Sequence, residues 1–242
     1  MFGNVYEDEE RARAYATLEF PGTYYLAFRD LPVLIRRHNH DARCALDFGC
    51  GTGRSTRFIR NLGLEVIGLD ISQAMLAQAR ALDPSGDYRL VRDNVVGEFT
   101  PASFDVILAA FTFDNIPTDE AKAGALSGLR TLLALNGSLL LVVSSAAIYV
   151  NEWASFSTRD FPENRQALDG DRVRIVMLDV PDRRPVEDVL CTDAHYRRLF
   201  ESAGLALLDV QSPLATGQEP TRWVSETTTA PWTIYVLGRP NR

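Results

Sequence analysis

The chain has 242 residues, of which 46% are hydrophobic and 24% are charged, as expected for a globular protein with one sizeable core. Its formal net charge is -7, and an acidic surface is repelled by a phosphate backbone, so nucleic acid is disfavoured as a partner. Three scattered cysteines favour a reducing compartment, and no apolar run resembles a signal peptide or spans a bilayer. We therefore expect a cytoplasmic protein that binds neither membranes nor nucleic acid.

The first half of the chain predicts alternating strands and helices. Residues up to about 40 predict helices that are interrupted at Pro21 and Gly22. Strands are then expected at 44–49, 65–70, 88–93, 104–111 and 137–145, and helices at 54–63, 72–82 and 119–134. Because these strands are almost continuously apolar, they indicate a parallel sheet covered by helices on both faces.

The pattern changes after residue 145. Strand-like runs at 172–180 and 184–192 predict a hairpin, followed by a helix at 193–204 and closing strands at 205–212 and 233–240. The connection between the last two strands is long, and long ordered loops in compact domains are usually functional. We expect one domain, 1–242, with an N-terminal helical lid (1–40), a cofactor-binding core (41–145), a substrate-side insertion (146–191) and a closing helix and strands (192–242).

A glycine-rich turn follows the first predicted strand in "LDFGCGTGR". A dinucleotide site requires G-x-G-x-x-G, and the position of the third glycine is Arg54 here. Asp47, at the end of the strand, would repel a pyrophosphate and attract a cation instead. Asp70 ends the second strand, where an acid commonly accepts hydrogen bonds from ribose hydroxyls. These features disfavour a nicotinamide oxidoreductase and favour a cationic nucleoside ligand.

The stretch "LDFGCGTG…VIGLDIS…ML" resembles the class I S-adenosylmethionine-dependent methyltransferase superfamily over residues 43–145. The resemblance implies a doubly wound, mostly parallel seven-stranded sheet and S-adenosylmethionine as the cofactor, with S-adenosylhomocysteine as the product. It implies the following cofactor-binding residues: Asp47, Gly49, Cys50, Gly51, Gly53, Asp70, Ile71, Met75, Asp93, Asn94, Ala109 and Phe111. Ile71 and Phe111 can equally be core residues, and Asp93 can cap a turn.

The N-terminal segment carries tyrosines at positions 6, 15, 24 and 25 and an arginine at position 29. The rings of Tyr15 and Tyr24 can cover a sulfonium, and Arg29 can bind the methionyl carboxylate at two points. We therefore add these three residues to the cofactor site and expect the segment to close as a lid. The alternative is that Tyr24 belongs to an apolar stripe in a helical core.

Subclass features point to a small-molecule acceptor. The motif of enzymes that methylate DNA bases is absent after the fourth strand, and the fifth strand ends in serines where a metal site would need an acid. We expect no metal and name Asp114, Tyr15 and Glu226 as catalytic candidates, whereas His195 fits a surface position. A cofactor-dependent enzyme of other chemistry, such as cyclisation, and a non-catalytic binding module remain open. The accepting atom and the oligomeric state stay undetermined.

Overall fold

The computed structural model describes residues 8–91 and 99–240. The helices are α1 (Glu9–Ala16), α2 (Thr23–Arg29), α3 (Leu31–His38), α4 (Arg54–Asn61), α5 (Gln73–Leu82), α6 (Asp119–Leu132) and α7 (Asp193–Ser202). The strands are β1 (Cys44–Phe48), β2 (Glu65–Asp70), β3 (Asp87–Leu90), β4 (Phe104–Ala110), β5 (Leu133–Ser144), β6 (Phe156–Ser157), β7 (Arg172–Met177), β8 (Val186–Val189), β9 (Ala206–Gln211) and β10 (Trp232–Gly238).

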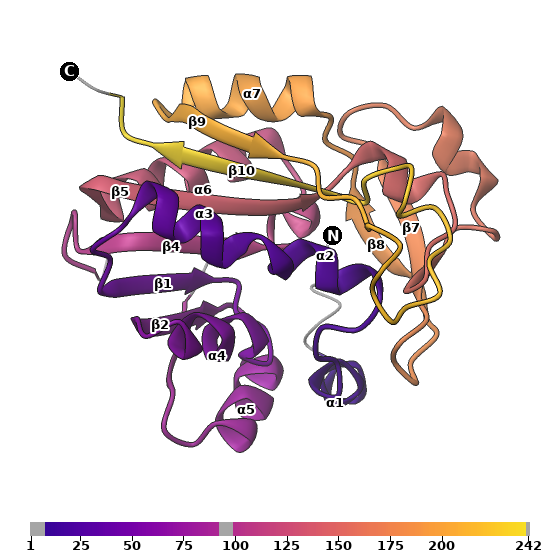
Figure 1. The fold of residues 1–242 in the computed structure, drawn as a ribbon, viewed down its shortest axis with the longest axis horizontal. Coiled ribbons are helices and arrows are strands. Elements are labelled where there is room, and N and C mark those ends of the chain that lie inside the picture. The colour runs from indigo at the N-terminus through magenta and orange to yellow at the C-terminus, as the bar shows by residue number, and fades with distance from the viewer. Residues whose placement is uncertain (1–7, 92–98, 241–242) are drawn as a thin grey trace.

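Seven strands form the main sheet in the order β3-β2-β1-β4-β5-β10-β9 (Figure 1). Strands β1 to β5 run parallel to one another, whereas β10 pairs antiparallel with both β5 and β9. The strand order reverses beside β1, so the carboxyl ends of β1 and β4 border the crevice in which ligands bind in open α/β sheets. The structure confirms the predicted doubly wound, mostly parallel seven-stranded sheet.

Helices cover both faces of this sheet. Apolar side chains of α2 and α3 share one buried cluster with alternate residues of the central strands, among them Val106, Leu140 and Ile234. The other face packs α6 and α7 against the intervening residues, including Ile107 and Leu141. Because successive residues of a strand point to opposite faces, a continuously apolar strand is required here.

The insertion is a second, three-stranded sheet, β6-β7-β8, at the end of the main sheet where β5 finishes. β7 and β8 are antiparallel, as the predicted hairpin requires, and β6 adds a short strand that the sequence did not indicate. Residues of the insertion such as Phe156 and Ile175 belong to the same buried cluster as α2 and α3. The insertion and the N-terminal helices are therefore packed on one another above the carboxyl ends of the strands.

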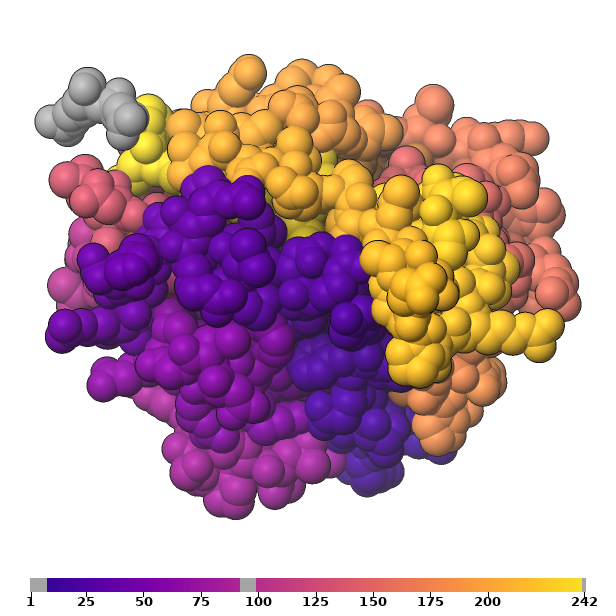
Figure 2. Space-filling view, viewed as in Figure 1, coloured from indigo at the N-terminus to yellow at the C-terminus, as the bar shows by residue number. Residues whose placement is uncertain are grey.

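Residues 212–231, drawn in gold in Figure 2, lie against both the insertion and the N-terminal helices. Arg29 of α2 donates to the backbone oxygen of Leu214, at 3.0 Å, and Thr23 donates to Glu226, at 2.6 Å. This connection thus fastens three segments that are far apart in the sequence. Within the described ranges, no helix has the length and apolar character needed to cross a bilayer.

Candidate functional site

The glycine turn joins β1 to α4 at the carboxyl edge of the sheet. Gly49, Gly51 and Gly53 all have positive φ, at 75°, 53° and 77°. The backbone N–H of Gly51 donates to Oδ2 of Asp70, at 2.8 Å, and the N–H of Ser72 donates to Oδ1, also at 2.8 Å. The carboxylate that ends β2 therefore lies directly beside the turn, as the sequence predicts.

The three glycines have different neighbours. A Cβ on Gly49 would lie 2.1 Å from Oγ1 of Thr112, and one on Gly53 would lie 2.5 Å from the hydroxyl of Tyr88. A Cβ on Gly51 would approach only a ring carbon of Tyr15 among the described residues, at 3.9 Å. Packing explains the glycines at 49 and 53, whereas a Cβ on Gly51 would make only an ordinary van der Waals contact with Tyr15. That all three glycines admit a ligand stays a prediction, and Gly51 is the position that packing on the described residues does not explain.

We expect Gly51→Ala to reduce binding of S-adenosylhomocysteine far more than stability. Its positive φ costs an alanine about 1 kcal/mol, and the new methyl group would occupy the space toward Tyr15, where we expect the ligand. Gly53→Ala is the matched control, because its methyl group would clash with the Tyr88 ring and lower the free energy of unfolding by roughly 2 kcal/mol more. Urea unfolding and titration calorimetry measure both quantities. Unchanged affinity in the folded Gly51 variant would contradict this assignment.

Asp47 does not face the open site. Its side chain is 0% exposed, and its Oδ2 accepts hydrogen bonds from the hydroxyls of Ser55, at 2.7 Å, and Thr56, at 2.6 Å. Its Oδ1 is buried and has no hydrogen-bond partner among the described residues. Burial raises the pKa of Asp47 to about 6. The expectation of direct contact with a cation is therefore corrected, because the first turn of α4 covers this carboxylate.

The raised pKa of Asp47 predicts a pH-dependent stability. Because its folded-state pKa lies above its ordinary value, the stability that Asp47 contributes is complete below that value and is lost as the pH rises through about 6. Asn cannot ionise. The free energy of unfolding of Asp47→Asn, relative to that of the parent protein, should therefore increase by about 1–2 kcal/mol when the pH rises from about 5 to about 8. Urea unfolding of both proteins at the two pH values, without ligand, measures this. A constant difference would show that Asp47 keeps an ordinary pKa.

Aromatic rings of the N-terminal segment surround the side chain of Arg54, a position that the sequence analysis did not assign to this segment. The guanidinium of Arg54 lies over the rings of Tyr15, Phe20, Tyr24 and Phe28, with its carbon 4.8 to 5.6 Å from their centroids. The Arg54 side chain is buried and also donates to the Tyr15 hydroxyl, at 3.4 Å. The rings expected to cover a sulfonium thus already contact a protein cation.

Arg29 lies outside this arrangement. Its guanidinium donates to both carboxylate oxygens of Asp30, at 2.9 and 2.8 Å, and contacts Glu219 at 3.4 Å. A two-point contact with a methionyl carboxylate would have to displace Asp30. Glu226 is likewise fully buried, and it accepts hydrogen bonds from Thr23, Ala154 and Val224. The structure therefore gives Arg29 and Glu226 roles in joining segments, and neither lines the pocket described next.

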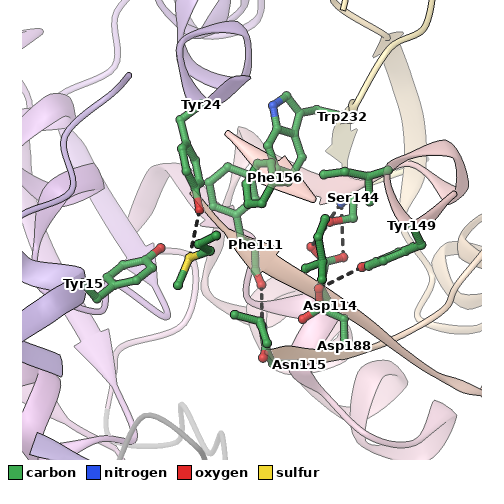
Figure 3. A pocket seen from close by; sticks show the side chains of 14 residues that line it. Tyr15, Tyr24, Phe111, Asp114, Asn115, Ser144, Tyr149, Phe156, Asp188 and Trp232 are labelled. Carbon is green, nitrogen blue, oxygen red and sulfur yellow. Dashed lines mark hydrogen bonds between the residues drawn. The ribbon is translucent and has the colours of Figure 1, made fainter. Parts of the chain in front are cut away.

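A pocket extends from Tyr15 to the interface between the main sheet and the insertion (Figure 3). It is partly open to solvent, and side chains of the N-terminal helices, the main sheet and the insertion all line it. Its wall is mainly aromatic and is formed by the side chains of Tyr24, Phe111, Phe156 and Trp232. Phe111 follows β4 with a φ of 63°, a strained conformation for a bulky residue that is typical of functional positions.

Two buried carboxylates lie at the end of the pocket away from Tyr15 (Figure 3). Asp114 accepts hydrogen bonds from the backbone N–H and the hydroxyl of Ser144, the latter at 2.9 Å. Asp188 of β8 accepts one from the hydroxyl of Tyr149, at 3.0 Å. Burial raises the pKa of both carboxyls, and the charge of Asp188 raises that of Asp114 further. The sequence predicted Asp114 at this site but gave no signal for Asp188.

The structure describes four of the remaining predicted residues. Ile71 is 41% exposed beside Asp70, whereas Cys50, Met75 and Ala109 are buried. Their contact with a cofactor stays a prediction. Asp93, Asn94 and Tyr6 lie outside the described residues. His195 is bonded to Asp119 at 2.7 Å, in a contact between α6 and α7 away from the pocket.

Comparisons with known proteins cover the core of the chain. Residues 46–139 match a family described as a methyltransferase domain. The chain is 32% identical over 109 residues to a ubiquinone biosynthesis O-methyltransferase of Burkholderia vietnamiensis, which is 43% of this chain and 45% of that protein. It is 41% identical over 61 residues to a dTDP-3-amino-3,6-dideoxy-alpha-D-glucopyranose N,N-dimethyltransferase of Streptomyces fradiae, which is 25% and 24% of the two chains. The matches thus span less than half the length of these curated relatives.

Solved structures resemble the whole fold. The CcbJ methyltransferase of Streptomyces caelestis superposes with a TM-score of 0.67 at 19% identity, over 98% of each chain. DesVI of Streptomyces venezuelae gives a TM-score of 0.63 at 18% identity, over 96% of this chain and 99% of its own. At such low identity these likenesses establish the fold alone. Together with the acid–glycine turn and the matched domain, they lead to one conclusion: the chain carries a methyltransferase domain over residues 46–139 and has the fold of solved S-adenosylmethionine-dependent methyltransferases.

Proposed function

We propose that this protein is an S-adenosylmethionine-dependent methyltransferase that acts on a small molecule. The observation that carries the proposal is the position of Tyr15, which lies beside Gly51 of the turn and also lines the aromatic pocket. Tyr15 thus connects a nucleoside-type turn with a second compartment. A non-catalytic module that only senses the cofactor would have no need of the second compartment.

The turn supplies the cofactor contacts in this proposal. Asp70 accepts two backbone N–H groups and is partly exposed, so we assign its carboxylate as the acceptor for the ribose hydroxyls. The exposed Ile71 offers an apolar surface to the adenine. Gly51 allows the backbone to approach the methionyl chain. When bound, S-adenosylmethionine supplies a methyl group that its positive sulfur has already activated.

The protein's own residues then align the acceptor and exclude water. A displacement of this kind needs the accepting atom in line with the methyl group at about 3 Å, which rigid aromatic walls can enforce. Tyr24, Phe111 and Trp232 pack on one another, with ring centroids 4.7 to 6.0 Å apart, so that the wall is preorganised. Of the three catalytic candidates that the sequence analysis named, Asp114 and Tyr15 line the pocket.

The relatives leave the accepting atom open. One is named as an O-methyltransferase of ubiquinone biosynthesis and another as an N,N-dimethyltransferase of an amino sugar nucleotide. Both names describe small-molecule acceptors rather than a nucleic acid or a protein. We accordingly assign a small-molecule acceptor to this chain, in agreement with its net charge of -7.

The N-terminal lid remains part of the proposal. Arg11 of α1 forms an ion pair with Asp182 of the insertion, at 3.3 Å, and both side chains are less than 10% exposed. Arg11 also donates to the backbone oxygen of Pro185. A buried ion pair is costly to break from one side, so this contact holds α1 in its closed position over the turn.

We expect Arg11→Ala to open the lid. Amide hydrogen exchange over residues 9–16 should accelerate at least about tenfold, since the loss of one buried partner costs several kcal/mol. Turnover should fall more than the affinity for S-adenosylhomocysteine, because the turn itself is intact. Arg13→Ala is the matched control, since Arg13 is exposed and pairs only with Glu9 of its own helix. Equal exchange in both variants would mean that α1 is fixed by other contacts.

Calorimetry and mass spectrometry test the proposed function. We expect S-adenosylhomocysteine to bind in the micromolar range and NAD not to bind. With methyl-labelled S-adenosylmethionine and a panel of small metabolites, the label should appear in an acceptor. Binding of NAD without S-adenosylhomocysteine would overturn the proposal. Consumption of the cofactor with no label in any acceptor would favour the cyclising or other non-methylating chemistry.

A further inference from the structure

The charged side chains among the described residues of the acceptor pocket are all acidic. Among the described residues that line it, two are carboxylates, Asp114 and Asp188, and none is Lys, Arg or His. Lys122 is buried behind Asp114 and lowers the pKa of both acids, but its own ammonium group donates to the backbone oxygen of Ile116 and does not line the pocket. Burial raises the pKa of both acids, and the described lining carries negative charge when either acid is ionised and no positive charge in any state.

The polar groups around the acids leave acceptor capacity free. A carboxylate offers about four lone-pair sites, and among the described residues Asp188 accepts a hydrogen bond from the hydroxyl of Tyr149. Ser144 supplies the donors to Asp114. A ligand that brings N–H donors and positive charge satisfies such a site, whereas a carboxylate, a phosphate or an ionised phenol is repelled by it.

The aromatic wall adds a second preference for positive charge. The rings of Phe111, Phe156 and Trp232 enclose the space in front of the acids, next to Tyr24, whose ring already contacts the Arg54 guanidinium (Figure 3). Aromatic faces attract an ammonium through their quadrupole, and the attraction is stronger where water is excluded. The pocket therefore combines the two recognition elements for an organic amine, a carboxylate floor and aromatic walls.

We propose that the methyl acceptor is an amine, which enters as an ammonium and is held by Asp114 and Asp188 against these aromatic rings. This inference rests on the proposed function and adds the accepting atom to it. The ammonium gives one proton to the carboxylate pair, and the freed lone pair of the nitrogen forms the bond to the methyl carbon. The electron pair of the broken sulfur–carbon bond stays on sulfur, and the carboxylates pass the proton to water.

Two independent features agree with this acid–base role. Because burial raises the pKa of both carboxyls, and the charge of Asp188 raises that of Asp114 further, they bind a proton more readily than surface acids do. The two acids also come from separate elements. Asp114 belongs to the short 3₁₀ helix Phe113–Asn115 after β4, and Asp188 belongs to strand β8 of the insertion. The insertion therefore completes the acceptor site rather than merely covering it.

A matched pair of probes tests the proposal. Binding of 2-phenylethylamine and of 2-phenylethanol is measured by ligand-observed NMR, with S-adenosylhomocysteine at saturation. The two molecules differ in the ammonium alone. We expect the amine to bind the parent protein about 10- to 100-fold more tightly, the range of a charge-assisted hydrogen bond. The preference should disappear in both Asp188→Asn and Asp114→Asn, which keep the shape of the side chain and its hydrogen-bond acceptor.

Glu187→Gln is the control. It removes the same charge from the next position of β8, where the side chain pairs with Arg172 and does not line the pocket. It should keep the preference for the amine. Equal or tighter binding of the alcohol to the parent protein, or failure of the amine to bind at millimolar concentration, would overturn the inference. If S-adenosylhomocysteine still binds in that case, the proposed function stands and only the nature of the acceptor is wrong.

Discussion

Replacing Asp70 by alanine is expected to weaken the binding of S-adenosylhomocysteine by about 2–3 kcal/mol, roughly a hundredfold in Kd. The variant loses the acceptor for the ribose hydroxyls. It also releases the N–H groups of Gly51 and Ser72, which the carboxylate holds at 2.8 Å. Both effects weaken binding, because the substitution removes the hydrogen-bond acceptor of the ligand and also the carboxylate that holds the backbone of the turn.

Titration calorimetry on Asp70→Ala measures this loss, and Asp87→Ala provides the control. Asp87 is the first residue of β3, where it lies opposite Ile67 of β2, and it pairs with the exposed Arg89. Its removal takes away the same charge without touching the site, and surface ion pairs contribute little to stability. An Asp70 variant that binds the ligand as tightly as the Asp87 variant would place the cofactor elsewhere.

Replacing Trp232 by alanine is expected to lower the free energy of unfolding by about 4 kcal/mol. The indole is 2% exposed, packs against Phe111 with a centroid distance of 4.7 Å, and donates its N–H to the backbone oxygen of Thr23, at 2.8 Å. Truncation leaves a cavity between the main sheet and the N-terminal helices, and the Thr23 oxygen loses its donor.

Urea unfolding measures the loss, with Trp223→Ala as the comparison. Trp223 belongs to the same connection, but it is only partly buried and donates to Glu219 at the surface. We expect its removal to cost about 1 kcal/mol. Equal losses at the two positions would mean that Trp232 is not the centre of this packing.

The sequence predicted those parts of the molecule that depend on local patterns. Apolar runs separated by helical segments predicted the strands from β1 to β5 and their parallel arrangement, because burial on both faces leaves a continuous signal. The end of β5 was also predicted, but its start at Leu133 was missed, since α6 leads directly into the strand. The position of Asp70 beside the glycines followed from the ends of two neighbouring strands.

The acceptor site was predictable only in part, because its residues meet through long-range contacts. Asp188 lies in a hairpin more than seventy residues after Asp114, and an acid within an apolar strand gives no indication of its partner. The sequence analysis considered Arg54 only because it replaces the third glycine of a dinucleotide site. In the structure its side chain is surrounded by aromatic rings. Glu226 was wrongly expected at the site, since composition cannot distinguish an acid that binds a ligand from one that joins segments of the fold.

The place of β10 in the sheet has a consequence for biosynthesis. This strand pairs along its whole length with β5, from Trp232 opposite Ser144 to Gly238 opposite Ser138, and on its other side with β9. Until residue 238 has left the ribosome, β5 and β9 each present an open edge, and exposed edges template aggregation. Nascent chains that stall before this point should therefore need a chaperone, whereas chains that extend past residue 238 can place β10 between β5 and β9.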